Sequence, residues 1–96
     1  MTRQDYIAAL RQYKEAHADQ YGIQRIGIFG SVARGEQTAD SDVDVCVQLA
    51  HPDLYYLVHI KDDLENLFNT TVDVVRLRDR MDALLRQNIE RDGIYA

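Results

Sequence analysis

Hydrophobic residues recur along the chain with two spacings, one typical of helices and one of strands, and these spacings predict where the helices and strands lie. Between Thr2 and Gly22 the periodic residues recur at intervals of three and four, the repeat of an amphipathic helix: Tyr6, Leu10, Tyr13 and His17. Thr2 followed by Asp5 is typical of a helix N-cap, and Gly22 is a natural C-terminal stop. From Asp42 to Leu49, valine or leucine alternates with other residues, which predicts a strand with one apolar face.

The other segments complete an alternating order of helices and strands. Residues 23–29 and 72–77 predict two more strands, and residues 31–35 fit one or two helical turns. Pro52 is expected in the first turn of a second long helix, whose apolar residues are Leu54, Leu57, Val58, Leu64, Leu67 and Phe68. A last helix, expected to end near Gly93, is marked by Met81, Leu84, Leu85 and Ile89. The order αβαβαβα predicts one α/β (α+β) domain over residues 1–96, with helices packed on a sheet.

Composition narrows the classes of function. The chain has 96 residues, with 11 Lys and Arg against 16 Asp and Glu and a net charge of −5. This acidic balance argues against tight, sequence-independent binding to nucleic acid, which depends on neutralising phosphates. Cys46 is the only cysteine, so no internal disulfide can form and a reducing, cytoplasmic location is expected. No apolar run reaches the ~18 residues of a membrane span, and residues 1–5 do not resemble a signal peptide.

Three aspartates are candidate metal ligands. Asp42 and Asp44 are two residues apart on the predicted strand, so both side chains leave the same face, with Cα atoms about 6.5–7 Å apart. Two such carboxylates repel each other unless a cation lies between them. Asp73 interrupts the apolar run Val72–Val75, where an acid is costly unless it is paired, hydrogen-bonded or bound to metal. If the two strands are neighbours, the three acids converge, and such hard oxygen ligands select Mg²⁺ or Mn²⁺.

A phosphate-binding turn is predicted just upstream of these acids. Ile28 and Phe29 end a strand, and Gly30 and Ser31 lead into a helix start, where backbone N–H groups are ready donors to an anion. Gly30 lets a phosphate approach the backbone closely, Ser31 adds a hydroxyl, and Arg34 could add a charge-assisted contact. A phosphate cradle beside a metal-binding acid pair suits phosphoryl or nucleotidyl transfer, because ions neutralise the developing charge and orient the reacting oxygens.

Each candidate also has a structural interpretation. Asp42 and Asp44 could form a solvated strand face, although the neighbouring Gly30–Ser31 turn weighs against this. Asp73 could instead pair with an arginine such as Arg34 or Arg76. Arg34 could be an ordinary surface residue.

Together these residues resemble the signature of the DNA polymerase β-type nucleotidyltransferase superfamily. The pattern is Gly30–Ser31, ten intervening residues and then Asp42–Val43–Asp44, with a third acid, Asp73, on a later strand. The longer runs Gly30 to Gly35 and Ser41 to Asp44 are similar to its minimal nucleotidyltransferase (MNT) branch. The resemblance covers nearly the whole chain and implies a small mixed sheet that carries the acids.

The resemblance also implies a role for each residue. Asp42 and Asp44 would hold two divalent ions, Mg²⁺ or Mn²⁺, and Asp73 would bind the catalytic ion and help take the proton from the attacking hydroxyl. Gly30 and Ser31 would hold the triphosphate of ATP, and Arg34 matches a motif position whose contact the motif does not define.

Stand-alone MNT proteins resemble the antitoxins of HEPN–MNT toxin–antitoxin pairs, which adenylylate a tyrosine of the HEPN ribonuclease toxin. The function implied for this chain is therefore transfer of AMP to a HEPN toxin, without direct contact with nucleic acid or membrane. Two alternatives stay open: an antitoxin that acts by binding alone, and nucleotidyl transfer to a small molecule such as an aminoglycoside. The sequence leaves the oligomeric state open between a homodimer and a hetero-oligomer.

Overall fold

The elements of the chain begin and end close to where the hydrophobic periods place them. A computed structural model describes residues 1–96, with elements in the following order: α1 (Arg3–Tyr21), β1 (Ile23–Phe29), α2 (Gly30–Arg34), β2 (Val43–Leu49), α3 (Leu54–Phe68), β3 (Val72–Arg76), α4 (Ala83–Asp92) and β4 (Ile94–Tyr95). The capping box of Thr2 and Asp5 is present, and Gly22 ends α1 in the left-handed conformation. The predicted order is confirmed. The structure adds β4, which the sequence does not predict because a strand of two residues is too short to show an alternating pattern.

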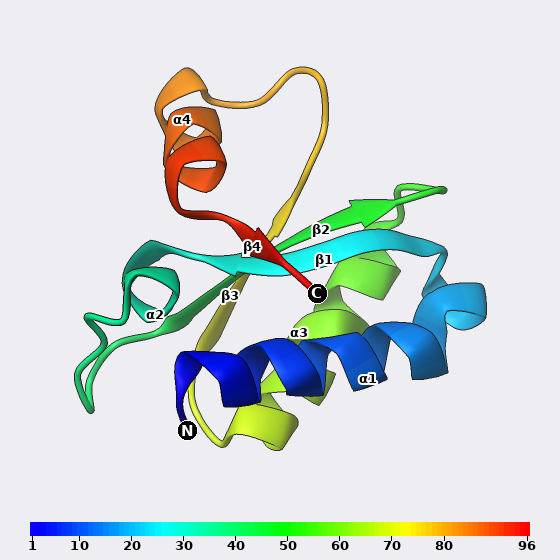
Figure 1. Ribbon diagram of the computed structural model, residues 1–96. Coiled ribbons are helices and arrows are strands. Elements are labelled where there is room, and N and C mark those ends of the chain that lie inside the picture. The colour runs from blue at the N-terminus through cyan, green and yellow to red at the C-terminus, as the bar shows by residue number, and fades with distance from the viewer.

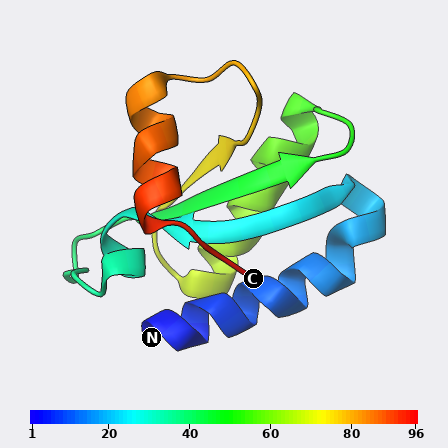
Figure 2. The ribbon, with the colours of Figure 1, turned by 45° about the horizontal axis from the view of Figure 1, so that its top comes forward.

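The strands form one mixed sheet in the order β3–β2–β1–β4 (Figure 1). β2 pairs with β3 in parallel, and β1 pairs with both β2 and β4 in antiparallel. α1 and α3 lie together on one face of this sheet, and α4 stands on the other (Figures 1 and 2). The α/β fold class with a small mixed sheet is therefore confirmed.

The alternation of β2 divides its side chains between the two faces of the sheet. Val43, Val45 and Val47 belong to the main core, which also holds buried residues of α1 and α3 such as Leu10 and Leu64. On the opposite face a smaller apolar cluster consists of Phe29, Cys46 and Ile89, the last of which comes from α4. Asp44 has the same parity along β2 as Cys46, so its side chain leaves the sheet on the α4 face.

The start and the exposed face of α3 differ from the prediction. Pro52 lies outside the helix, because Asp53 is the N-cap and its carboxylate accepts a hydrogen bond from the Tyr55 N–H. Leu54 and Val58 are exposed rather than packed, as is Leu67, while the buried residues of α3 are Ile60, Leu64 and Phe68. The apolar repeat therefore predicts the helix and the burial of Leu64 and Phe68 correctly, but it is wrong for Leu54, Val58 and Leu67.

None of the helices combines the length and the apolar composition needed to cross a membrane.

Candidate active site

Two of the three predicted acids lie side by side on adjacent strands. In the parallel register of β2 and β3, Asp44 is the Cα partner of Asp73, and in the antiparallel register of β1 and β2 it is the partner of Phe29. Asp42 is exposed and precedes the first residue of β2 by one position. The condition on which the predicted convergence depended, that the two strands are neighbours, is therefore met.

The start of β3 is held in place by an ion pair on α3. Glu65 accepts a hydrogen bond from the Val72 N–H at 3.0 Å, and Lys61 Nζ donates to the Val72 carbonyl at 2.9 Å. The same two side chains meet at 3.1 Å. Since Val72 immediately precedes Asp73, these contacts fix the backbone from which the Asp73 side chain emerges.

The three carboxylates have no cationic partner in the protein. None of the salt bridges involves Asp42, Asp44 or Asp73, so the alternative in which Asp73 pairs with Arg34 or Arg76 is not realised. Burial raises the pKa of the Asp44 carboxyl, and the negative charges of Asp73 and then Asp42 raise it further, while Arg34 opposes the shift. Asp44 is thus half-buried among like charges, an environment that a cation would relieve.

The turn after β1 brings the backbone against this carboxylate. Gly30 has a φ of +70°, and a Cβ built on it would collide with the carboxylate of Asp44. α2 starts at Gly30, and the residue before it, Phe29, supplies no side-chain cap to the first turn. Gly30 therefore lies directly against Asp44, and the partly exposed Ser31 follows it as the second residue of α2.

Arg34 is anchored to two acids that the sequence did not single out for it. Its Nε donates to Glu36 at 3.0 Å, and its Nη1 donates to Asp92 at 2.7 Å. These two hydrogen bonds raise the pKa of the Arg34 guanidinium. Arg34 is thus a surface residue, as that alternative had it, but one whose guanidinium is held by two carboxylates. Asp92 gave no signal in the sequence, because it is 58 residues away and reaches Arg34 only through the packing of α4 beside α2.

The donor chemistry of the acids fits a divalent cation. No group of three or more His, Cys, Asp or Glu side chains forms a metal site by itself, so Asp42, Asp44 and Asp73 do not close a cage around one point. Mg²⁺ in phosphoryl-transfer sites is usually bound by one or two carboxylates together with substrate phosphates, which does not need such a cage. Carboxylates without a cationic partner, next to the glycine that starts α2, match that kind of site.

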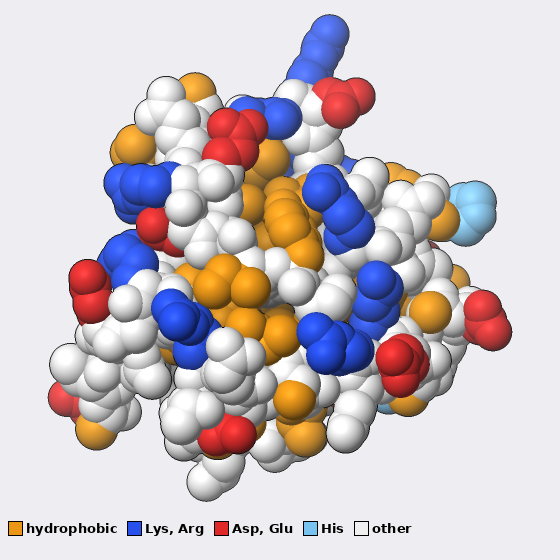
Figure 3. All heavy atoms as spheres, in the orientation of Figure 1, with side chains coloured by type: hydrophobic (Ala, Val, Ile, Leu, Met, Phe, Trp, Pro, Cys, Tyr) orange, Lys and Arg blue, Asp and Glu red, His pale blue; other side chains and the backbone are white.

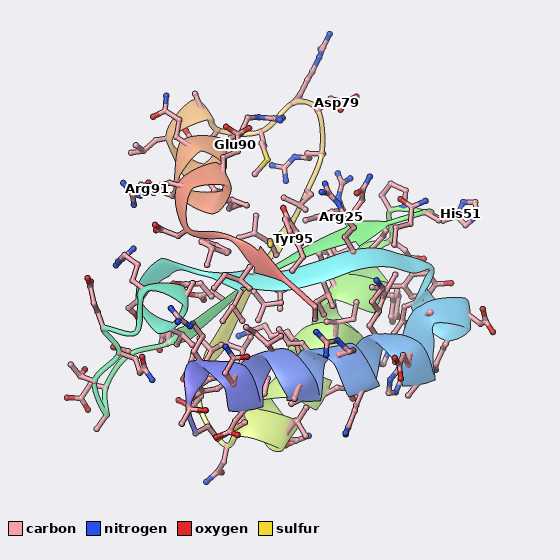
Figure 4. All side chains as sticks on the ribbon, in the orientation of Figure 1. Arg25, His51, Asp79, Glu90, Arg91 and Tyr95 are labelled. Atoms are coloured by element: carbon pink, nitrogen blue, oxygen red, sulfur yellow. The ribbon has the colours of Figure 1, made fainter.

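A separate pocket of about 410 Å³ opens on the face of the sheet that carries α4. It contains none of the predicted site residues, and among its lining residues are Arg25, Gln48, Arg86, Glu90 and Tyr95. The Arg25 guanidinium lies 4.7 Å from the centre of the Tyr95 ring, and the two side chains stand next to each other above β1 (Figure 4). On the face seen in Figure 3, hydrophobic side chains occupy the middle and Lys and Arg side chains surround them. Gln48 is four residues from Asp44 along β2, or about 13 Å by strand rise, so this pocket is distinct from the acids.

Aspartates without a cationic partner lie on two neighbouring strands, next to a glycine that starts a helix. Residues 11–95 match the family model described as Polymerase beta, Nucleotidyltransferase. The chain therefore belongs to this family of enzymes, and the resemblance inferred from Gly30–Ser31 and Asp42–Asp44 is confirmed.

Similar proteins agree with this assignment. Protein adenylyltransferase MntA of Thermococcus cleftensis is 29% identical over 96 residues, which are 99% of this chain and 96% of the relative. A solved structure described as a minimal nucleotidyltransferase superposes with a TM-score of 0.76 at 33% identity, covering 98% of this chain and 95% of the other. A toxin–antitoxin structure with AMP-PNP gives a TM-score of 0.66 at 30% identity. The match covers 76% of this chain and spans only 59% of that one.

Proposed function

We propose that this protein is a metal-dependent protein adenylyltransferase that transfers AMP from ATP to a tyrosine hydroxyl of a HEPN ribonuclease toxin and so acts as its antitoxin. The observation that carries the proposal is the pairing of Asp44 with Asp73 next to Gly30, because it places two carboxylates without a cationic partner beside the glycine that starts α2. The adenylyltransferase name of the Thermococcus relative supports the reaction. The toxin–antitoxin structure with AMP-PNP supports both the partner and the nucleotide.

The residues divide the work of binding. Asp42 and Asp44 would hold two Mg²⁺ ions, with Asp73 as a further ligand of the catalytic one. When bound, such ions neutralise charge on the triphosphate and make the acceptor hydroxyl more acidic. Gly30 and Ser31 receive the triphosphate at the start of α2, where the missing Cβ of Gly30 lets the backbone lie directly against the Asp44 carboxylate. Arg34 adds a guanidinium donor to the phosphate oxygens.

The chemical step is a substitution at the α-phosphorus of ATP. The acceptor oxygen forms a bond to this phosphorus, the bond to the bridging oxygen breaks, and pyrophosphate leaves with the electron pair. Asp73 helps remove the proton of the acceptor hydroxyl. The acceptor surface itself comes from the partner. A cytoplasmic location, as expected from the sequence, is part of the same proposal.

A direct experiment is to incubate the protein with a cognate HEPN toxin, ATP and Mg²⁺ and to measure the intact mass of the toxin. We expect a gain of one or more AMP residues with the parent protein and none with the double variant Asp42→Asn, Asp44→Asn. The variant keeps the shape of both side chains but removes two charges, so it should still associate with the toxin. Protection of cells by the double variant, without any mass change on the toxin, would show that the protein neutralises the toxin by binding alone.

A further inference from the structure

The carboxylate of Asp92 joins arginines from two helices. It accepts Arg34 Nη1 from α2 at 2.7 Å, and from its neighbour Arg91 it accepts Nε and Nη2, both at 3.0 Å. Its side chain is only 6% exposed, whereas that of Glu36, the other acid on Arg34, is 66% exposed. Asp92 is therefore the fixed anchor of the Arg34 guanidinium, and Glu36 is a solvated second contact.

The pairing leaves part of the guanidinium free to bind a ligand. An arginine side chain carries five N–H donors in a planar fork. Arg34 uses Nε for Glu36 and Nη1 for Asp92, and no hydrogen bond to the protein involves its Nη2. Arg34 is also the last residue of α2, the five-residue helix whose first residue, Gly30, lies against Asp44. Arg34 is thus held near the acids with donors to spare.

Holding a long side chain in one orientation favours binding. A free arginine loses rotamer freedom when it contacts a ligand, and that loss weakens the interaction. An arginine already fixed by a buried carboxylate has lost this freedom on folding. The hydrogen bonds from Arg91 and Arg34 keep the pKa of the Asp92 carboxyl below its usual range, so the anchor stays ionised near neutral pH.

We propose that Asp92 is a positioning residue for nucleotide binding, which holds Arg34 so that its free N–H groups donate to the phosphates of ATP. This inference rests on the proposed function, since it deepens the role given there to Arg34. This role of Asp92 differs from that of a purely structural ion pair, or tether, that only joins α2 to α4. A tether would affect only stability, whereas a positioning residue affects the affinity for ATP through Arg34 and not otherwise.

A double-mutant cycle on ATP affinity tests the proposal. The dissociation constant for ATP with Mg²⁺ is measured by calorimetry without any acceptor, for the parent, Asp92→Ala, Arg34→Ala and the double variant. We expect each single variant to weaken ATP binding about tenfold and the double variant to be no weaker than Arg34→Ala alone, because Asp92 acts through Arg34. Glu36→Ala should have a smaller effect than Asp92→Ala. Asp62→Asn, which removes an exposed carboxylate from α3, is the control for net charge.

The outcomes separate this inference from the proposed function. Unchanged ATP affinity in Asp92→Ala, or additive losses in the double variant, would overturn the positioning role even if the parent adenylylates the toxin. Normal coupling in the cycle, with no AMP on any toxin, would leave the positioning role intact and refute the proposed acceptor. If Asp92→Ala does not fold, Asp92→Asn replaces it, and the same coupling with Arg34→Ala is required. Where transfer occurs, Asp92→Ala should raise KM for ATP much more than it lowers kcat.

Discussion

Asp44 and Asp73 face the same side of the sheet as direct partners in the parallel pairing of β2 and β3, and neither has a basic side chain to neutralise it. In a sheet, like charges directly opposite each other are destabilising. The fold tolerates this cost at the one place where a glycine turn also approaches, which is the relationship expected of a site built for a ligand rather than for stability.

Replacing Asp44 should therefore stabilise the metal-free protein. The pKa of Asp44 is raised in the folded state, so its ionised form opposes folding above the ordinary pKa of an aspartate. Asp44→Asn should gain roughly 0.2–1 kcal/mol in the free energy of unfolding at pH 7. The gain should shrink as the pH falls through the raised pKa of Asp44, because the parent carboxyl becomes protonated there. Urea unfolding at pH 7 and pH 3 in EDTA measures both values. A loss of stability at pH 7 would show that Asp44 has a favourable partner.

ATP should stabilise the protein only when a divalent cation is present. Ligand binding raises the free energy of unfolding by about 2.7 kcal/mol at a concentration of one hundred times the dissociation constant. We expect this gain in Tm with ATP and Mg²⁺ or Mn²⁺, and little of it with ATP in excess EDTA. Equal stabilisation by ATP in EDTA would show that ATP binds without a metal ion. Asp42→Asn with Asp44→Asn should abolish the metal-dependent part without unfolding the protein.

A comparison of Gly30 with Gly35 separates the effect of the Gly30 contact with Asp44 from the effect of the left-handed backbone conformation. Gly30 and Gly35 have nearly the same φ, +70° and +72°, but a Cβ on Gly35 would meet nothing within 4 Å, while one on Gly30 would collide with Asp44. Gly35→Ala should cost about 1–2 kcal/mol, the price of a left-handed alanine. Gly30→Ala should cost more and should also weaken ATP binding, which Gly35→Ala should leave unchanged. Equal effects of the two substitutions on ATP affinity would place the phosphate elsewhere.

A hydrogen bond between α1 and α3 offers a stability change remote from the site. Tyr13 donates its hydroxyl to Asp63 at 2.8 Å, and burial followed by this contact raises the pKa of Tyr13. Tyr13→Phe should lose about 1 kcal/mol of stability and leave ATP affinity unchanged. Because the folded state favours the neutral phenol, parent stability should also fall as the pH rises above about 10. Denaturant unfolding of parent and variant between pH 7 and 11 checks both statements.

The sequence could predict the site to the extent that local pattern determines it. The strict alternation of β2 fixes the face of Asp44. The apolar run around Asp73 predicts a costly buried acid, and this is wrong, because Asp73 is exposed at the start of β3. The partners of Arg34 could not be predicted, because Asp92 reaches it only after α4 has packed onto the sheet. The exposure of Leu54 and Val58 was also missed, since helical periodicity does not define how far a helix extends beyond the sheet it covers.

Ile89 and Asp92 lie three residues apart on α4, and therefore on the same side of the helix. The first is buried against Phe29 and Cys46, and the second holds Arg34. Local opening of α4 would break both contacts together, so the docking of this helix and the state of Arg34 are thermodynamically linked. A nucleotide that binds through Arg34 would then slow amide hydrogen exchange across residues 83–92, a segment that contains none of the predicted ligands of the metal or the triphosphate.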